Sequence, residues 1–146
     1  MSGIFSLFRR TLADRRGAVI VEFALLGPLA IAMMLGVLQI GIALQSYNAI
    51  RNVSADTARH TAVAYQTNNK LSDTQIRQYA LATAITAPYL LQNSGLTISC
   101  ADAATQPITG ATEKTLSISY QVPSILTLLG YSSPSINFTR PIFVAN

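Results

Sequence analysis

The chain contains one long apolar run, over residues 18–44, in which only Glu22 and Gln39 are polar. At a rise of 1.5 Å per residue, these 27 residues would form a helix about 40 Å long. About 20 apolar residues are enough to cross the hydrocarbon core of a bilayer. We therefore expect residues 18–44 to form a transmembrane helix.

A helical pattern continues beyond the apolar run, over residues 45–66. No proline or glycine interrupts the chain between Leu44 and Thr67. Apolar or small residues recur there at three-and-four spacing: Tyr47, Ile50, Val53, Ser54, Thr57, Ala58, Thr61 and Tyr65. The pattern predicts one helix from about Ala18 to Tyr65, amphipathic in its second half and ended by the polar residues that follow.

Residues 67–146 show the shorter patterns of a small domain. Ser72 and Gln75 have the spacing of a capping box, which predicts a second helix that Pro88 ends or kinks. Strand patterns cover residues 96–100, 115–122 and 136–144, and Pro141 indicates that the third strand is an edge strand or bulged. The predicted fold class is α+β: a long helix that continues into an exported domain with a second helix and a three-stranded antiparallel sheet.

Basic charge is concentrated before the apolar run. Residues 1–17 contain Asp14 and four arginines, namely Arg9, Arg10, Arg15 and Arg16. From Ala18 onward, six basic and five acidic residues nearly balance. By the positive-inside rule, the arginines place the amino terminus in the cytoplasm and residues 45–146 outside. The net charge of +4 therefore indicates topology. It does not indicate a nucleic-acid partner, which would need basic residues across the folded domain.

Composition also favours a membrane protein over a soluble one. Half of the residues are apolar, only 11% are charged, and the mean hydropathy is +0.37. A cleaved secretory signal is the alternative for the apolar run. The run is about twice as long as the apolar part of a signal peptide, and no A-x-A-like site closes it. We therefore interpret it as an anchor in the lipid bilayer.

The sequence shows no pattern of an enzyme. His60 is the only histidine and Cys100 the only cysteine, so neither has the companions that a zinc site requires. No phosphate-binding loop, dinucleotide fingerprint or nucleophile elbow is present. The acids Asp56, Asp73, Asp102 and Glu113 are scattered, and we interpret them as solvated. We expect no catalytic residues, no metal and no cofactor.

The junction between the basic leader and the apolar run has the chemistry of a processing site. Gly17 has no side chain, so the backbone there can enter a protease cleft. Cleavage would create a positive amine on Ala18, one helical turn from Glu22 on the same face. An ionisable residue in an apolar span is costly and is usually functional. The alternative is that Glu22 only extends its carboxylate to the inner headgroups.

Small residues recur every four positions along the apolar run, at Ala24, Pro28, Ala32 and Gly36. Such a stripe lets another helix approach closely, although small residues are also common in membrane helices by composition alone. Pro28 removes a backbone hydrogen bond and predicts a kink near Ala24.

These motifs carry a resemblance to a known family. Gly17, four residues and then Glu22-Phe23 resemble the processing site of type IV prepilins, in the Flp-like type IVb branch. The stretch from Arg15 to Ala62, with its EFALLGP run, resembles the TadE family of minor pseudopilins from tight-adherence (Tad) pilus and secretion systems. TLSISYQVPSILTLLGY is similar to the strand and the Pro- and Leu-rich turn of that family. Its place within the TadE, TadF and TadG group stays open.

The resemblance implies a type IV pilin-like fold and a specific life cycle. A prepilin peptidase would cleave after Gly17, and Glu22 with Phe23 would register the subunit against a neighbouring pilin. The implied partners are the major Flp-type pilin, other minor pseudopilins and the platform proteins of the bacterial inner membrane. The implied domains are a cytoplasmic leader (1–17), a transmembrane helix (18–44), a helix extension (45–66) and a periplasmic domain (67–146), which could enter a surface pilus.

Two other functions remain open. An uncleaved single-pass anchor could present a binding or adaptor domain to the periplasm. Residues 45–146 could also act as an adhesin, although no aromatic cluster marks a binding surface for a glycan.

Overall fold

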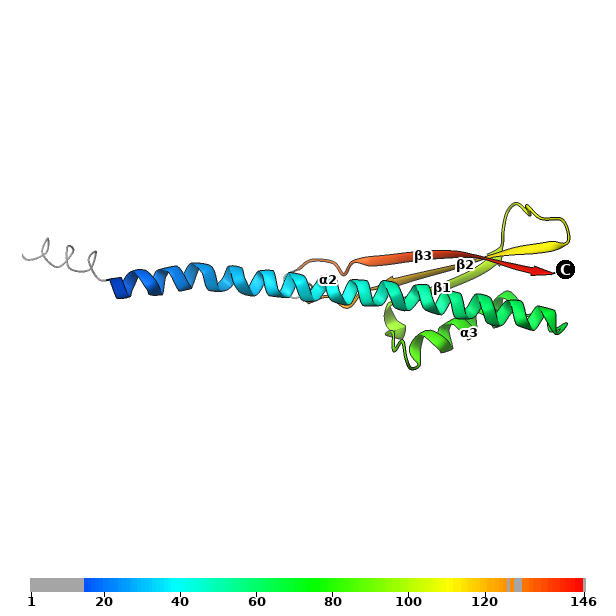
Figure 1. The fold of residues 1–146 in the computed structure, drawn as a ribbon, viewed down its shortest axis with the longest axis horizontal. Coiled ribbons are helices and arrows are strands. Elements are labelled where there is room, and N and C mark those ends of the chain that lie inside the picture. Colours follow the sequence, from blue (N-terminus) through cyan, green and yellow to red (C-terminus); the bar gives the residue numbers. More distant parts are fainter. Residues whose placement is uncertain (1–14, 126, 128–129, 146) are drawn as a thin grey trace, which may run out of the picture. The chain divides into compact units, whose positions relative to one another are not determined.

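A computed structural model of the chain describes residues 15–125, 127 and 130–145, and only the backbone of Arg15, Arg16 and Ala18. The elements are α2 (Arg15–Gln66), α3 (Asp73–Ile85), a 3-10 turn η1 (Asn93–Gly95), β1 (Leu96–Asp102), β2 (Ala111–Gln121) and β3 (Ser135–Ala145) (Figure 1). The predicted α+β class, with a long first helix, a second helix and a three-stranded sheet, is confirmed. The chain divides into two compact units, one up to Leu38 and one from Gln39 to the carboxyl end.

The long helix predicted from the apolar run and the pattern behind it is one continuous element, α2. It begins three residues before the predicted start at Ala18 and ends one residue after the predicted end at Tyr65. Beyond it, Asn68 adopts a φ of 59°, and its N–H donates to the carbonyl of Tyr65. The helix continues through Pro28, so the kink near that residue stays a prediction.

The second helix, α3, starts at the predicted capping box. The Ser72 hydroxyl accepts a hydrogen bond from the Gln75 N–H at 3.3 Å, and the Gln75 carboxamide oxygen accepts one from the Ser72 N–H at 2.8 Å. These two bonds satisfy donors that the first turn would otherwise leave free. The helix ends at Ile85, three residues before Pro88, as the sequence predicts.

The sheet is antiparallel with strand order β1-β2-β3. β1 extends its predicted range by two residues at its end, and β3 extends its range by one residue at each end. β2 begins four residues early, at Ala111, and ends one residue early, at Gln121. Ala111, Thr112 and Glu113 pair with the last residues of β3. Those pairs depend on a distant strand, so local alternation does not reveal them. Pro141 lies in β3, which is an edge strand as predicted.

Both helices of the Gln39–Asn146 unit pack on one face of the sheet. The core contains Ile50 and Val53 from α2, Ile76 and Ala80 from α3, and alternate residues of the strands: Leu116, Ile118, Tyr120, Ile142 and Val144. α3 contacts β1, and the ring of Tyr47 on α2 meets Phe138 on β3 edge to face, with centroids 6.1 Å apart. Burying each large aliphatic side chain stabilises the fold by about 1.5–3 kcal/mol.

Candidate functional site

The first half of α2 is apolar and unburied. Within the described residues, the part of α2 from Val19 onward is the one helix long and apolar enough to cross a bilayer, and none of its most apolar stretch is buried. Phe23 is 75% exposed, and Leu25 and Val37 are similarly open. An exposed apolar surface of this length fits a single-pass membrane anchor. A helix suits this environment because its backbone carbonyls and amides bond within the segment, apart from the bond that Pro28 removes.

Glu22 is an exposed carboxylate within this apolar surface. In the described part of the chain, the salt bridges are those of Lys114, so Glu22 has no cationic partner there. Its neighbours Val21 and Phe23 are also exposed. The carboxylate is therefore exposed to its surroundings, and its role in registering the subunit against a neighbouring pilin stays a prediction.

The predicted processing site lies at the start of α2. Gly17 is helical and exposed, and a side chain added there would meet no atom within 4 Å. The side chains of Ala18, Arg15 and Arg16, and all of Arg9 and Arg10, lie outside what the structure describes. The roles of these four arginines in topology, and of Gly17 and Ala18 in cleavage, therefore stay predictions.

The small-residue stripe is open on the surface of α2. Ala24, Pro28 and Ala32 are exposed and Gly36 is half-buried, and a Cβ added at Gly36 would touch nothing within 4 Å. This face is therefore unfilled by the chain itself. Its packing against a second helix stays a prediction.

Gln39 has a role that the sequence pattern did not reveal. Its side chain is buried, with 7% exposed, and it holds the connection between β2 and β3. The Gln39 Nε2 donates to the Pro123 carbonyl at 3.2 Å, and its Oε1 accepts from the Ile125 N–H at 3.2 Å. A lone amide in an apolar helix was the available signal, because a polar group there requires a partner.

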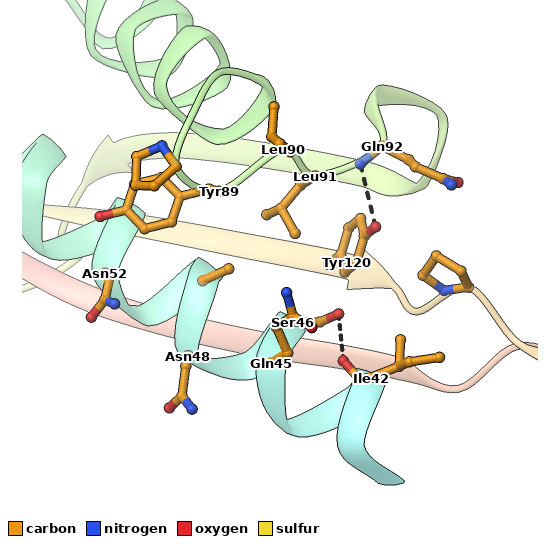
Figure 2. A pocket seen from close by; sticks show the side chains of 13 residues that line it. Ile42, Gln45, Ser46, Asn48, Asn52, Tyr89, Leu90, Leu91, Gln92 and Tyr120 are labelled. Atoms are coloured by element: carbon orange, nitrogen blue, oxygen red, sulfur yellow. Dashed lines mark hydrogen bonds between the residues drawn. The ribbon is translucent and has the colours of Figure 1, made fainter. Parts of the chain in front are cut away.

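A groove of about 440 Å³ lies beside Gln45, between α2 and the turn that follows α3. Figure 2 shows Leu91 pointing towards α2 and Tyr120, whereas Leu90 points the opposite way. Leu91 is buried, and the Gln92 N–H donates to the Tyr120 hydroxyl at 3.3 Å. Leu90 is 69% exposed and has a φ of 51°. The groove is lined by uncharged residues, with asparagines of α2 on one side.

The prediction that the acids are scattered is wrong for two of them, Asp73 and Asp102, which converge on one lysine while staying partly exposed. Lys114 is buried, and its Nζ lies 2.7 Å from Asp73 and 2.6 Å from Asp102. Burial opposes the charge of Lys114, but its hydrogen bonds to Asp102 and Asp73 outweigh that effect and raise its pKa. This cluster joins the start of α3 to both strands of the first hairpin. Asp56 is also bonded, accepting from the Tyr89 hydroxyl at 2.8 Å.

Cys100 and His60 have structural neighbours. Burial, followed by the charge of Asp73, raises the pKa of the Cys100 thiol from 9.0 to about 11. The His60 ring stacks on Tyr79, with centroids 3.8 Å apart. Among the described residues, no three His, Cys, Asp or Glu side chains are grouped so as to hold a metal ion.

The fold and the exposed helix define a class: a membrane-anchored protein with a small α+β domain. A comparison with protein families gives the particular family. The model described as TadE-like protein matches residues 17–59, less than a third of the chain. Over these residues the chain is similar to TadE-like proteins, which agrees with the resemblance noted in the sequence. No curated protein and no solved structure matches it.

Proposed function

We propose that this chain is a minor pilin or pseudopilin that a prepilin peptidase cleaves after Gly17 and that takes part in initiating or assembling a Tad/Flp type IVb pilus. One observation carries the proposal. The family match begins at Gly17 and includes Glu22, a carboxylate without a cationic partner among the described residues, on an exposed apolar helix. A soluble domain rarely exposes such a large apolar surface. In a pilin subunit, the same surface would contact lipid in the bilayer and other helices in the fibre.

The assembly step follows from charge. After cleavage, the new Ala18 amine of one subunit and the Glu22 carboxylate of another would pair in surroundings where neither charge is stable alone. The pair fixes the axial register of two helices, while the stripe from Ala24 to Gly36 allows close approach. The arginines keep the leader, residues 1–17, in the cytoplasm until cleavage. The anchor lies in the bacterial inner membrane, and the carboxyl-terminal domain lies in the periplasm. The partners are the major Flp-type pilin, other minor pseudopilins and the platform proteins.

The amino terminus of the mature protein tests the proposal. The full chain is expressed with and without a Tad-type prepilin peptidase, purified from membranes, and its amino-terminal sequence and intact mass are measured. We expect Ala18 first when the peptidase is present and Met1 otherwise. Gly17→Val should block cleavage because its branched side chain obstructs the backbone, whereas Leu29→Val on the same helix should be cleaved normally.

An intact leader in the presence of an active peptidase that processes the major pilin would overturn the proposal. That result would favour the alternative, an uncleaved single-pass anchor that presents a binding or adaptor domain to the periplasm. The uncharged groove beside Gln45 is the feature that such a domain would use.

A further inference from the structure

We propose that the free edge of β1 binds an extended segment of another protein as a fourth strand of the sheet. The segment would lie in the groove between β1 and α3. It would have apolar side chains at alternate positions and one acidic side chain beside Arg77. This inference goes beyond the proposed function, because it concerns only the Gln39–Asn146 unit and does not depend on cleavage.

The backbone of β1 has hydrogen-bonding groups on the side away from β2. Among the described strands, β1 is an edge and pairs with β2 alone. The Ala103 N–H donates to the Glu113 carbonyl at 2.8 Å, and this pair continues the register of the two strands. Only alternate residues of an antiparallel strand bond to its neighbour. The other set therefore faces the free edge, and beyond Leu96, whose N–H donates to Asn93, it consists of Ile98, Cys100 and Asp102.

The opposite edge of the sheet, β3, is less suited to a new strand. The Val122 N–H donates to the Pro134 carbonyl at 2.9 Å, and this pair continues the register of β2 with β3. By the same alternation, the backbone of Pro141 faces the free edge of β3. Proline has no N–H, and proteins commonly use an edge proline to prevent further strand pairing. β1 contains no proline, so it is the more open of the two edges.

A groove of about 320 Å³ lies beside the β1 edge. It is lined by Leu81 of α3 and by Leu96 and Ile98 of β1, and all three side chains are only half-buried. Their cross-strand partners on β2 are buried, since Ile98 is paired with Ile118 and Leu96 with Tyr120. A further strand would cover the apolar side chains that β1 leaves partly open, and burying them would favour binding.

Arg77 gives this groove its one charge. The remaining lining residues are uncharged: Gln78, Leu81, Asn93, Leu96 and Ile98. Arg77 is exposed, and in the part of the chain that the structure describes the salt bridges are those of Lys114. Its guanidinium therefore lacks an anionic partner there. A carboxylate is the group that matches a guanidinium best, because two parallel N–H donors can bond to its two oxygens.

These features together define the chemistry of the ligand. When a sheet edge binds a peptide, main-chain hydrogen bonds provide affinity and pockets for alternate side chains provide specificity. Side chains on the helix-covered face of the sheet would enter the groove, so they should be apolar, with one acid to meet Arg77. Side chains on the other face would lie beside Thr97 and Ser99, which are exposed, so they should be polar.

Synthetic peptides can test this site on the full chain in mild detergent. The probes are fluorescein-labelled peptides of seven residues, with Thr at the odd positions, Glu at the centre, and the same apolar residue (Val, Ile, Leu or Phe) on both sides of it at the other even positions. The pattern reads the same in both directions, so the probes suit either orientation of the added strand. Scrambled peptides of the same composition and peptides with Gln at the centre are the controls, and fluorescence anisotropy measures binding.

We expect the patterned peptides to bind more tightly than their scrambled versions. Arg77→Gln should weaken the binding of the Glu peptides about two- to fivefold, as expected for an exposed ion pair, and should leave the Gln peptides unchanged. Arg51→Gln is the matched control, because Arg51 is an exposed arginine that does not line the groove. Circular dichroism checks the fold of each variant.

Backbone pairing has a separate readout. An added strand bonds to β1 through every second N–H. N-methylation of one alternate set of peptide amides should therefore abolish binding, whereas N-methylation of the other set should be tolerated. In hydrogen exchange of the full chain, the bound peptide should slow the N–H groups of Ile98 and Cys100 and none in β3.

Three results would overturn the inference. The patterned peptides could fail to bind, or bind no better than the scrambled ones. Arg77→Gln could weaken the Glu and Gln peptides equally, which would mean that the groove does not recognise an acid. The Ile98 and Cys100 N–H groups could be protected without peptide, increasingly at higher protein concentration, which would mean that a second copy of the chain covers the edge. None of these results bears on cleavage after Gly17, so the proposed function is tested separately.

Discussion

Hydroxyl side chains on α2 show how a membrane-anchored helix can pack closely on a sheet without leaving polar atoms unsatisfied. Ser46, Ser54, Thr57 and Thr61 are all buried, and each donates to a carbonyl three or four residues earlier at 2.7–2.8 Å. An unsatisfied buried hydroxyl would cost about 1–3 kcal/mol. Because the bonds are local, these small residues occupy the core side of the helix at little cost.

Cys100 provides a prediction at the same scale. Burial and the nearby Asp73 raise the pKa of its thiol from 9.0 to about 11, and only the thiolate reacts with an alkylating reagent. In the folded protein, the rate of alkylation by iodoacetamide should therefore rise about tenfold per pH unit up to a midpoint near pH 11. The urea-unfolded chain is the control and should show its midpoint near 9. A folded-state midpoint at or below 9 would contradict the assigned environment.

The stability consequence of this thiol has a definite sign. An acidic group whose pKa is higher in the folded state lowers the free energy of unfolding as pH rises, because the unfolded chain ionises first. The raised pKa of Cys100 therefore destabilises the fold between about pH 9 and pH 11. Below pH 9 the thiol is protonated in both states and makes no pH-dependent contribution.

At the scale of elements, the sequence predicted what local patterns determine. The capping box at Ser72, the alternation in β2 and the edge position indicated by Pro141 depend on neighbours along the chain, and all three are confirmed. The contacts that join elements were not predictable in this way. Lys114 meets Asp73 across 41 residues, and Gln39 meets Pro123 across 84. No local pattern encodes such pairs, because they form only when the sheet and helices are packed.

Gln39 is the clearest test of a contact between elements. Gln39→Leu keeps an apolar helix but leaves the Pro123 carbonyl and the Ile125 N–H without their partner. We expect a loss of about 1–3 kcal/mol in the free energy of unfolding for an unsatisfied buried group. Denaturant unfolding of the full chain in mild detergent, followed by circular dichroism, measures it.

The matched control is Gln45→Leu, an exposed glutamine on the same helix. It should change stability by less than about 0.5 kcal/mol, as surface substitutions usually do. Equal effects of the two variants would show that the Gln39 bonds do not hold the β2–β3 connection.

At the scale of the whole molecule, the chain separates two kinds of surface. From Val19 to Leu38 the described side chains are mostly exposed and apolar, whereas the unit from Gln39 encloses a packed core and contains ten charged residues. The family match spans the boundary, from Gly17 to Arg59. The matched segment thus contains the apolar part of α2 and most of the part of α2 that packs on the sheet.

The proposed function predicts that assembly depends on Glu22. In Glu22→Ala, Gly17 and Ala18 are unchanged and the peptidase should still cleave, but the Ala18 amine of a neighbouring subunit would lose its counter-charge. We expect amino-terminal sequencing to find Ala18 first, while crosslinking to the major pilin and recovery in sheared pili fall sharply. Glu22→Asp, which keeps the charge on a shorter side chain, should recover part of the incorporation, and Gln45→Ala on the same helix should resemble the native chain. Normal cleavage with normal incorporation of Glu22→Ala would show that this carboxylate does not register the subunit.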